Sequence, residues 1–499
     1  MDRFERPRTE CHYLNILRLC IHQLGHDASS VNVYGINQYS CNGSSRPENP
    51  FRQCPLKDSL SKVDNILSVF LPDNIHPTAS EGSLGRKRDE KPHHTTFQKD
   101  ASLFGIPVMH DIHDLQDSLI LSGFLPDDPR FQEIFAIKPT TSPESPRLQK
   151  RVGHAEEVVT RALQGTLAIP DFQRFKQGVK EIFEQVREKE LGGSVAKYIP
   201  QLASVDPNLF AVSFCSIDGQ RFNLGDADVD FSIQSCSKPI TYSIALEEQG
   251  AAKVHSHVGK EPSGQSFNHM SLLVKRKLPH NPMINAGAIM TSSLIQVGMP
   301  LYKRFGKVTE IWSELFGGKK VGFNNSVYLS EKDTADRNYA LAYMMKEAGA
   351  FPENTNLYES LEFYFQCCSL EASTDKMAIL AATYANGGIC PITNTHVFDP
   401  STVRNCISLM ASCGMYDYSG EWNFQVGLPA KSGVGGAIWV VVPNVGGFCC
   451  YSPPVDELGN STKGLEFFKM LSERYAFHMM EPQRLRGLKM DPTTRGEKE

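Results

Sequence analysis

The sequence predicts an α+β fold in which an antiparallel sheet is flanked by helices. Phe210 to Ile217 alternates as a strand does, and Asp218-Gly219 follows it as a strong hairpin signal. Far downstream, Ala437 to Val442 and Phe448 to Tyr451 flank a second turn. Helical patterns fill the sequence between these strands. We therefore expect N-terminal and C-terminal strands of one domain to pair in the same sheet.

Three helices of this domain have clear sequence limits. A long amphipathic helix is expected from Gln173 to Glu190, where Gly192-Gly193 closes it. A second runs from Pro239 to Gln249, with proline near its start and Gly250 just past its end. The last amphipathic pattern covers Thr462 to Phe477.

The preceding sequence divides into two parts. Residues 1–100 show little periodicity beyond short helical patterns at 13–24 and 60–70, and 77–99 has the polar composition of a linker. A small helical unit follows, with apolar spacing typical of helices at 108–121 and 154–167. We divide the chain into an N-terminal region (1–100), a small helical domain (101–170), an α+β domain (171–480) and a C-terminal tail (481–499).

Composition narrows the function classes. Hydrophobic residues make up 40% and charged residues 21%, as in a soluble globular protein, and the net charge of −5 gives no electrostatic case for nucleic acid. No apolar run is long enough to span a membrane. The 13 cysteines follow no disulfide framework, which indicates reduced thiols in an intracellular compartment. Acidic residues near the N-terminus weaken a transit-peptide interpretation, so mitochondrial and cytoplasmic locations both stay open.

The motif that suggests chemistry is Gln234-Ser235-Cys236-Ser237-Lys238-Pro239. Residues three apart lie on one face of a helix, so Lys238 can reach Ser235. A neutral lysine can take the proton of a serine and make it a nucleophile, and Ser-x-x-Lys is a signature of covalent serine hydrolases. The alternative is a serine N-cap followed by a solvated lysine.

Further clusters in the same domain are rich in polar groups and glycine. Lys431-Ser432-Gly433 leads into a strand, where Ser-x-x-Lys hydrolases carry a Lys-(Thr/Ser)-Gly triad beside the active site. Asn285 is either a ligand-binding amide or an N-cap. Glu331 and Asn338 suit an ammonium and a carboxylate or amide, or else a capping box and surface ion pairs. Two further tyrosines, Tyr364 and Tyr416, lie among apolar residues, where the commonest partner of a tyrosine is structural.

In this order the clusters closely resemble the glutaminases of the animal kidney and liver type. The stretches that carry the resemblance lie between Ile169 and Phe477 and are Tyr198 to Ala203, Gln234 to Pro239, Val258 to Gly264, His280 to Ala288, Asp336 to Asn338, Cys413 to Asp417 and Gly427 to Gly433. The resemblance implies a β-lactamase/DD-peptidase-like catalytic domain at 171–480. It also implies that the helical unit at 101–170 is EF-hand-like, although no stretch has the acidic spacing of a calcium loop.

The resemblance also implies an activity and its residues. The substrate would be L-glutamine, hydrolysed to L-glutamate and ammonia through a covalent glutamyl-enzyme. Ser235 would be the nucleophile, Lys238 its base and Tyr416 a proton relay, and Tyr198, which lines the same pocket, would be the fourth catalytic residue. The positions that match glutamine binding in the family are Ser235, Asn285, Glu331, Asn338, Tyr364, Tyr416 and Val434. No metal or other cofactor is implied, but activation by inorganic phosphate and assembly into dimers and tetramers are.

This chain departs from the family pattern at two places. Family members usually carry an acidic stretch before the His-Asn-Pro motif, where this chain has Lys275-Arg276-Lys277. In the family this loop gates the site and contacts partner subunits, so the departure bears on phosphate activation and filament formation. Ankyrin repeats, which usually follow in the family, are expected to be absent. Two other functions stay open, a penicillin-recognising hydrolase or esterase and a non-catalytic scaffold that kept the fold.

Overall fold

The structure is a computed structural model, and it describes residues 112–132 and 146–495. The predictions for residues 1–111, including the two short N-terminal helices, lie outside the described residues. The helices and 3₁₀ turns are, in chain order, α3 (Ile112–Leu121), α5 (Pro146–Gln164), α6 (Phe172–Glu188), α7 (Pro200–Ala203), η3 (Gln234–Ser237), α8 (Lys238–His257), α9 (Asn285–Ser293), α10 (Leu301–Leu315), α11 (Asn325–Asp333), α12 (Asp336–Glu347), α13 (Leu357–Cys368), α14 (Thr374–Ala385), α15 (Pro400–Cys413), η4 (Tyr416–Tyr418), α16 (Ser419–Gln425), α17 (Thr462–Arg474) and α18 (Gln483–Arg486).

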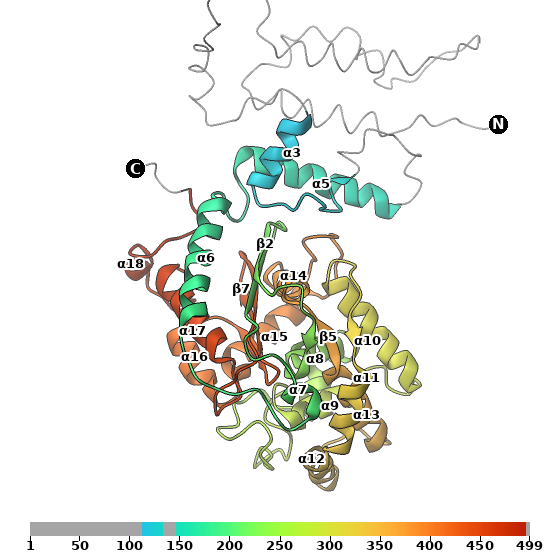
Figure 1. The fold of residues 1–499 in the computed structure, drawn as a ribbon. Coiled ribbons are helices and arrows are strands. Elements are labelled where there is room, and N and C mark those ends of the chain that lie inside the picture. Colours follow the sequence, from blue (N-terminus) through green and yellow to red (C-terminus); the bar gives the residue numbers. More distant parts are fainter. Residues whose placement is uncertain (1–111, 133–145, 496–499) are drawn as a thin grey trace, which may run out of the picture.

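A five-stranded antiparallel sheet with the order β2-β1-β8-β7-β6 lies at the centre (Figure 1). Its strands are β1 (Ala211–Ser216), β2 (Arg221–Gly225), β6 (Ala430–Gly433), β7 (Ala437–Val442) and β8 (Gly446–Tyr451). The predicted pairing of N-terminal and C-terminal strands is confirmed, because β1 pairs with β8 and places Phe214 opposite Phe448. Both predicted hairpins are present as β1–β2 and β7–β8.

Both faces of this sheet are buried. Along β7, Ile438, Val440 and Val442 belong to one hydrophobic cluster, whereas Trp439 and Val441 belong to the other. The period of two explains why this strand is a continuous apolar run. Helices α6 and α17 cover the first face with a cluster rich in phenylalanine, and α14 covers the second.

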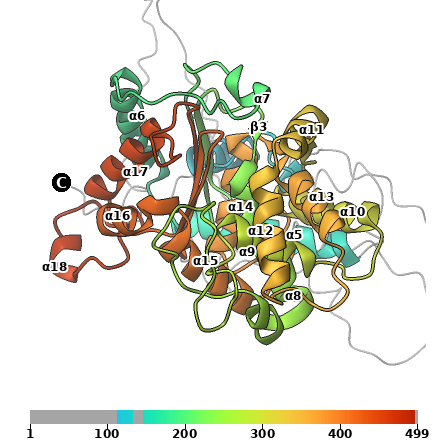
Figure 2. The same cartoon turned by 90° about the horizontal axis from the view of Figure 1, so that it is seen from below.

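A helical layer beyond α14 completes the domain. Helices α8, α9, α12 and α13 pack against one another and form the larger core (Figure 2). A small sheet with the order β3-β5-β4 joins this layer to the rest, from β3 (Phe231–Ser232), β4 (Gly322–Phe323) and β5 (Leu370–Ala372). The turn η3 lies between the helical layer and β6, and so between the two halves of the domain.

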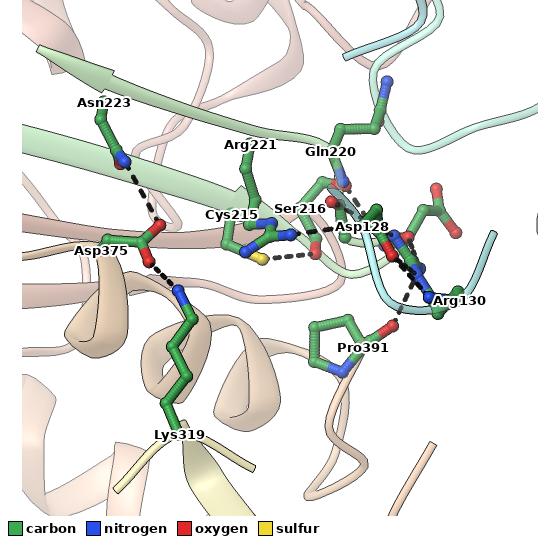
Figure 3. A network of polar contacts seen from close by, with 12 residues as sticks. Asp128, Arg130, Cys215, Ser216, Gln220, Arg221, Asn223, Lys319, Asp375 and Pro391 are labelled. Carbon is green, nitrogen blue, oxygen red and sulfur yellow. Dashed lines mark hydrogen bonds and ion pairs between the residues drawn. The ribbon is translucent and has the colours of Figure 1, made fainter. Parts of the chain in front are cut away.

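The helical unit of α3 and α5 docks on the β1–β2 hairpin through a buried charge cluster (Figure 3). Arg130 makes hydrogen bonds of 2.9 and 2.7 Å to the carboxylate of Asp128, which Arg221 also approaches at 3.4 Å. The Arg130 guanidinium also donates to the backbone oxygens of Asp218 (2.6 Å) and Pro391 (3.0 Å). Gly219, at φ +85°, leaves room for it, since a Cβ there would lie 2.6 Å from the guanidinium.

Most element predictions are confirmed, with differences at the ends. Helix α17 ends at Arg474, three residues before the predicted limit, and α5 already begins at Pro146. Gly250 ends the first part of α8 as expected, at φ +74°, but the chain returns to helix at once and continues to His257. None of the helices within the described ranges is long and apolar enough to cross a membrane. The nine cysteines in those ranges are all buried and unpaired.

We expect Arg130→Met to lower the free energy of unfolding by about 3 kcal/mol, because it leaves a buried carboxylate and two carbonyls without their main donor. Urea denaturation measures this. Lys307→Met is the control, since it breaks the exposed Lys307–Glu310 pair and should cost less than about 1 kcal/mol. Equal losses in the two variants would contradict a structural role for the buried cluster.

Candidate active site

Ser235 lies on a 3₁₀ turn that leads directly into a helix. The backbone N–H of Lys238 donates to the Ser235 carbonyl and joins η3 to α8. A 3₁₀ helix has three residues per turn, so the side chains of Ser235 and Lys238 lie along one edge. Ser235 is not a helix N-cap, because Ile233 holds that position for η3 and Ser237 holds it for α8. Lys238 is 1% exposed, which excludes the solvated-lysine alternative.

Two residues beside Ser235 have backbone conformations that non-glycine residues rarely adopt. Gln234 has φ +52° and Tyr416 has φ +54°. Left-handed conformations of such residues cost free energy and concentrate at functional sites, where the surrounding structure enforces them. Here the strain fixes the direction in which Ser235 enters the turn and the direction of the Tyr416 ring.

The Lys238 amine is buried and held by an amide. Its Nζ donates a 2.6 Å hydrogen bond to Asn285 Oδ1, and Asn285 Nδ2 donates to Asn338 Oδ1 at 3.1 Å. Burial lowers the pKa of Lys238 to about 8, although the Cys368, Cys236 and Glu331 groups oppose this. About a tenth of the amine is therefore neutral at pH 7 and able to accept a proton, far more than for a lysine with its ordinary pKa.

Tyr416 lies against the same turn. Its side chain is 8% exposed, and burial raises the pKa of its hydroxyl, while hydrogen bonding from the Ser235 side chain and the Val434 backbone opposes this rise. No hydrogen bond of regular geometry satisfies this hydroxyl within the described part of the chain. Lys431 Nζ lies 4.4 Å from the centre of the Tyr416 ring, and burial, with Lys238 nearby, lowers the pKa of Lys431 to about 7.

A carboxylate defines the other end of the site. The Tyr198 hydroxyl lies 2.6 Å from Glu331 Oε1 and 2.8 Å from Gln234 Oε1, and it can donate its single proton to either oxygen. The Tyr198 residue is 46% exposed, but these bonds show that its hydroxyl points inward. Burial raises the pKa of Glu331, and Tyr198, Gln234 and Lys238 oppose that rise. Tyr364 is buried beside Glu331 and Cys368, and burial raises its pKa.

The Lys431-Ser432-Gly433 motif occupies β6, the edge strand of the sheet, as the sequence predicts. A Cβ on Gly433 would lie 3.1 Å from both Cys236 Sγ and the Ile233 carbonyl oxygen, so β6 leaves little room for a side chain between itself and the turn η3. This contact fixes the turn that carries Ser235 against the sheet.

The structure brings all nine sequence-predicted residues into one site. Two of the alternatives are wrong: Asn285 is not an N-cap, since Ile284 holds that position, and Glu331 is not in a surface ion pair. Sequence reasoning missed three contributors, namely Gln234, Phe267 and Cys368. No local pattern points to Phe267 or Cys368, but Gln234 stands directly before the motif serine. Among the described residues, no group of three or more His, Cys, Asp or Glu side chains could hold a metal ion.

Comparison with known proteins matches this arrangement. The sequence model of the family described as glutaminase matches residues 193–480, more than half of the chain. The chain belongs to the glutaminase family. It is 44% identical over 393 residues to the mouse protein named "Glutaminase liver isoform, mitochondrial", covering 77% of this chain and 65% of the relative. The chain therefore spans about two thirds of that relative's length. A glutaminase from Nostoc sp. is 42% identical over 58% of this chain and 85% of its own length.

Solved structures show the same catalytic fold. A probable glutaminase, ybaS, superposes with a TM-score of 0.58 at 34% identity, over 62% of this chain and 99% of that chain. The protein Mglu in its glutamate form gives 0.57 at 36% identity, over 61% of this chain and 68% of that chain. The β-lactamase-like α+β fold that the sequence predicts is thus confirmed for this glutaminase family member.

We expect Gly433→Ala to destabilise the protein by about 1–3 kcal/mol, because the new methyl group overpacks the contact between β6 and η3. The matched control is Gly420→Ala in α16, where no atom lies within 4 Å of the new Cβ and alanine favours the helix. Thermal and urea unfolding of both variants checks this. A neutral Gly433→Ala would mean that β6 does not fix the turn.

Proposed function

We propose that this chain hydrolyses L-glutamine to L-glutamate and ammonia through a covalent Ser235 ester. The observation that carries the proposal is the buried Lys238 amine beside Ser235, in a chain that belongs to the glutaminase family. A base with a pKa of about 8 holds enough neutral amine near pH 7 to activate a serine, which an exposed lysine does not.

The first half-reaction forms the ester. The Ser235 Oγ attacks the side-chain carboxamide carbon of glutamine while its proton passes to Lys238 Nζ. The backbone N–H groups of Ser235 and Val434 stabilise the oxyanion, and the position of the Val434 N–H beside the Tyr416 hydroxyl supports this role. Tyr416 passes a proton to the leaving nitrogen and recovers one from Lys238. The C–N bond breaks and ammonia departs.

The second half-reaction restores the enzyme. Water attacks the glutamyl ester and gives its proton to Lys238, and the C–O bond to Ser235 breaks. Ser235 regains its proton and glutamate leaves. The steps balance without a metal, an oxidant or another cofactor.

Substrate choice comes from the polar end of the pocket. Glu331 pairs with the α-ammonium of glutamine, and Asn285 and Asn338 bind the α-carboxylate. A charged Glu331 carboxylate that is buried without a cationic partner costs free energy. The ammonium group of an amino acid lowers this cost, whereas a simple amide has no ammonium group and does not. Tyr198 holds the carboxylate in position, and Tyr364 covers the pocket beside it.

The wider context of the reaction is also a proposal. The mouse relative's name includes the word mitochondrial, which supports a mitochondrial over a cytoplasmic location. Dimer or tetramer assembly and activation by inorganic phosphate follow from the family resemblance. The ammonia-release assay, run with and without phosphate, and light scattering of the same sample address both.

We expect Ser235→Ala to reduce ammonia release from glutamine by about 10⁴-fold, because no other group in the site can form the ester. The variant should stay folded, since Ser235 makes no capping bond that the turn depends on. An ammonia assay that uses no glutamate dehydrogenase measures turnover, and circular dichroism shows whether the variant is folded. Turnover within tenfold of the parent would exclude Ser235 as the nucleophile.

We expect Glu331→Gln to raise the KM for glutamine by about 10- to 100-fold, because it replaces a charged hydrogen bond to the ammonium with a neutral one. Steady-state kinetics measures the change. Asp333→Asn is the matched control, since it removes the same charge from an exposed position on the same helix and should leave KM unchanged. Equal effects of the two variants would rule out a direct Glu331–ammonium pair.

A further inference from the structure

One aromatic side chain from the loop of residues 259–284 enters the site. The Phe267 ring centre lies 4.8 Å from that of Tyr416, and Lys238 Nζ lies 5.9 Å from the Phe267 ring centre. Phe267 is half-buried and packs on the larger core, whereas Gln265, Ser266 and His269 around it are exposed. Phe267 therefore lies over the two groups that move protons in the proposed reaction.

The backbone of this residue is tied to the same site. The Phe267 carbonyl accepts a 3.1 Å hydrogen bond from the Asn285 N–H, and the Asn285 side chain is the partner of Lys238. The base of the loop is closed by bonds from the Gly259 N–H to the Pro279 carbonyl and from the Glu261 N–H to the His280 carbonyl. Asn285, at the start of α9, therefore binds both the backbone of Phe267 and the amine of Lys238.

The charges around Lys238 do not make it neutral by themselves. Glu331 on α11 and the thiols of Cys368 on α13 and Cys236 on η3 all favour the charged form. The nearby Lys238 helps to lower the pKa of Lys431 on β6, whereas burial is what lowers the pKa of Lys238 itself. The Phe267 face would attract a cation, but 5.9 Å is close to the outer limit of about 6 Å for that attraction. Exclusion of water is thus the effect that such a ring contributes.

We propose that Phe267 is a positioning residue that keeps water away from Lys238 and holds the Tyr416 ring against Ser235. This inference rests on the proposed function and extends it to a residue that the sequence did not assign to the site. Phe267 acts through Lys238 and Tyr416 and takes no part in bond making.

The test is the pH profile of kcat/KM for ammonia release from glutamine, between pH 6 and 9. A neutral Lys238 is the active form, so activity falls as the pH drops through its pKa. Phe267→Ala admits water and should move this acidic limb up by one pH unit or more, about a tenfold loss at pH 7 that recovers as the pH rises. Phe267→Tyr keeps the aromatic ring, so the acidic limb of its pH profile should lie at the same pH as in the parent protein.

Val274→Ala is the matched control, because Val274 belongs to the same loop and is 93% exposed. It should leave the profile unchanged. The proposal would be overturned if Phe267→Ala lowered kcat/KM by the same factor at every pH, or did not lower it at all. If Phe267→Ala fails to fold, Phe267→Leu, which covers less of the amine, should show a smaller shift of the limb in the same direction, and an unshifted limb would overturn the proposal as well. A parent protein that releases no ammonia would instead refute the proposed function itself.

Discussion

A lysine amine buried without a carboxylate partner is the constraint on which the site depends. Lys238 is held by an amide oxygen of Asn285, and an amide does not fix the charge of the amine as a carboxylate would. The neutral state therefore has to come from burial, and burial has to be supplied by elements on every side. Helix α8, the turn η3, the edge strand β6 and the aromatic rings of Tyr416 and Phe267 share that task.

The site contains a second buried lysine, Lys431. Lys431 lies over the Tyr416 ring, and its repulsion with Lys238 means that both amines cannot be charged at low cost. A single proton shared between two buried amines titrates as a property of the pair. The Glu331 carboxylate is also buried, and its hydrogen-bond partner is the neutral Tyr198 hydroxyl rather than a cation. The site thus holds two buried amines, Lys238 and Lys431, and a buried carboxylate, Glu331, that forms no ion pair within the described part of the chain.

Local patterns predicted the parts of this structure that local forces determine. The two hairpins, the long helices and the strand carrying Lys431-Ser432-Gly433 follow from turn residues and apolar spacing. The Ser-x-x-Lys spacing is local too, and the structure has a 3₁₀ turn at this motif.

Contacts that join distant segments could not be predicted in this way. Asparagine is a residue type that is common at N-caps, so the sequence left that interpretation open for Asn285. Its hydrogen bond with Lys238, 47 residues away, forms only when the chain has folded. The positive φ angles of Gln234 and Tyr416 run against residue preference and are enforced by their surroundings. Arg130 likewise finds carbonyls 88 and 261 residues away.

The pairing of β1 with β8 has a consequence for how the protein is made. Residues 211–216 leave the ribosome long before residues 446–451, and until the later strand arrives β1 has β2 alone as a paired strand. The serine turn likewise waits for β6, because Cys236 packs on the Lys431 and Ala437 backbone. Such distant pairing is slow and leaves apolar surface open during synthesis. A nascent chain therefore carries Ser235 for some 200 residues of translation before β6 is made, and a truncated product that ends before β6 would lack the strand against which the serine turn packs.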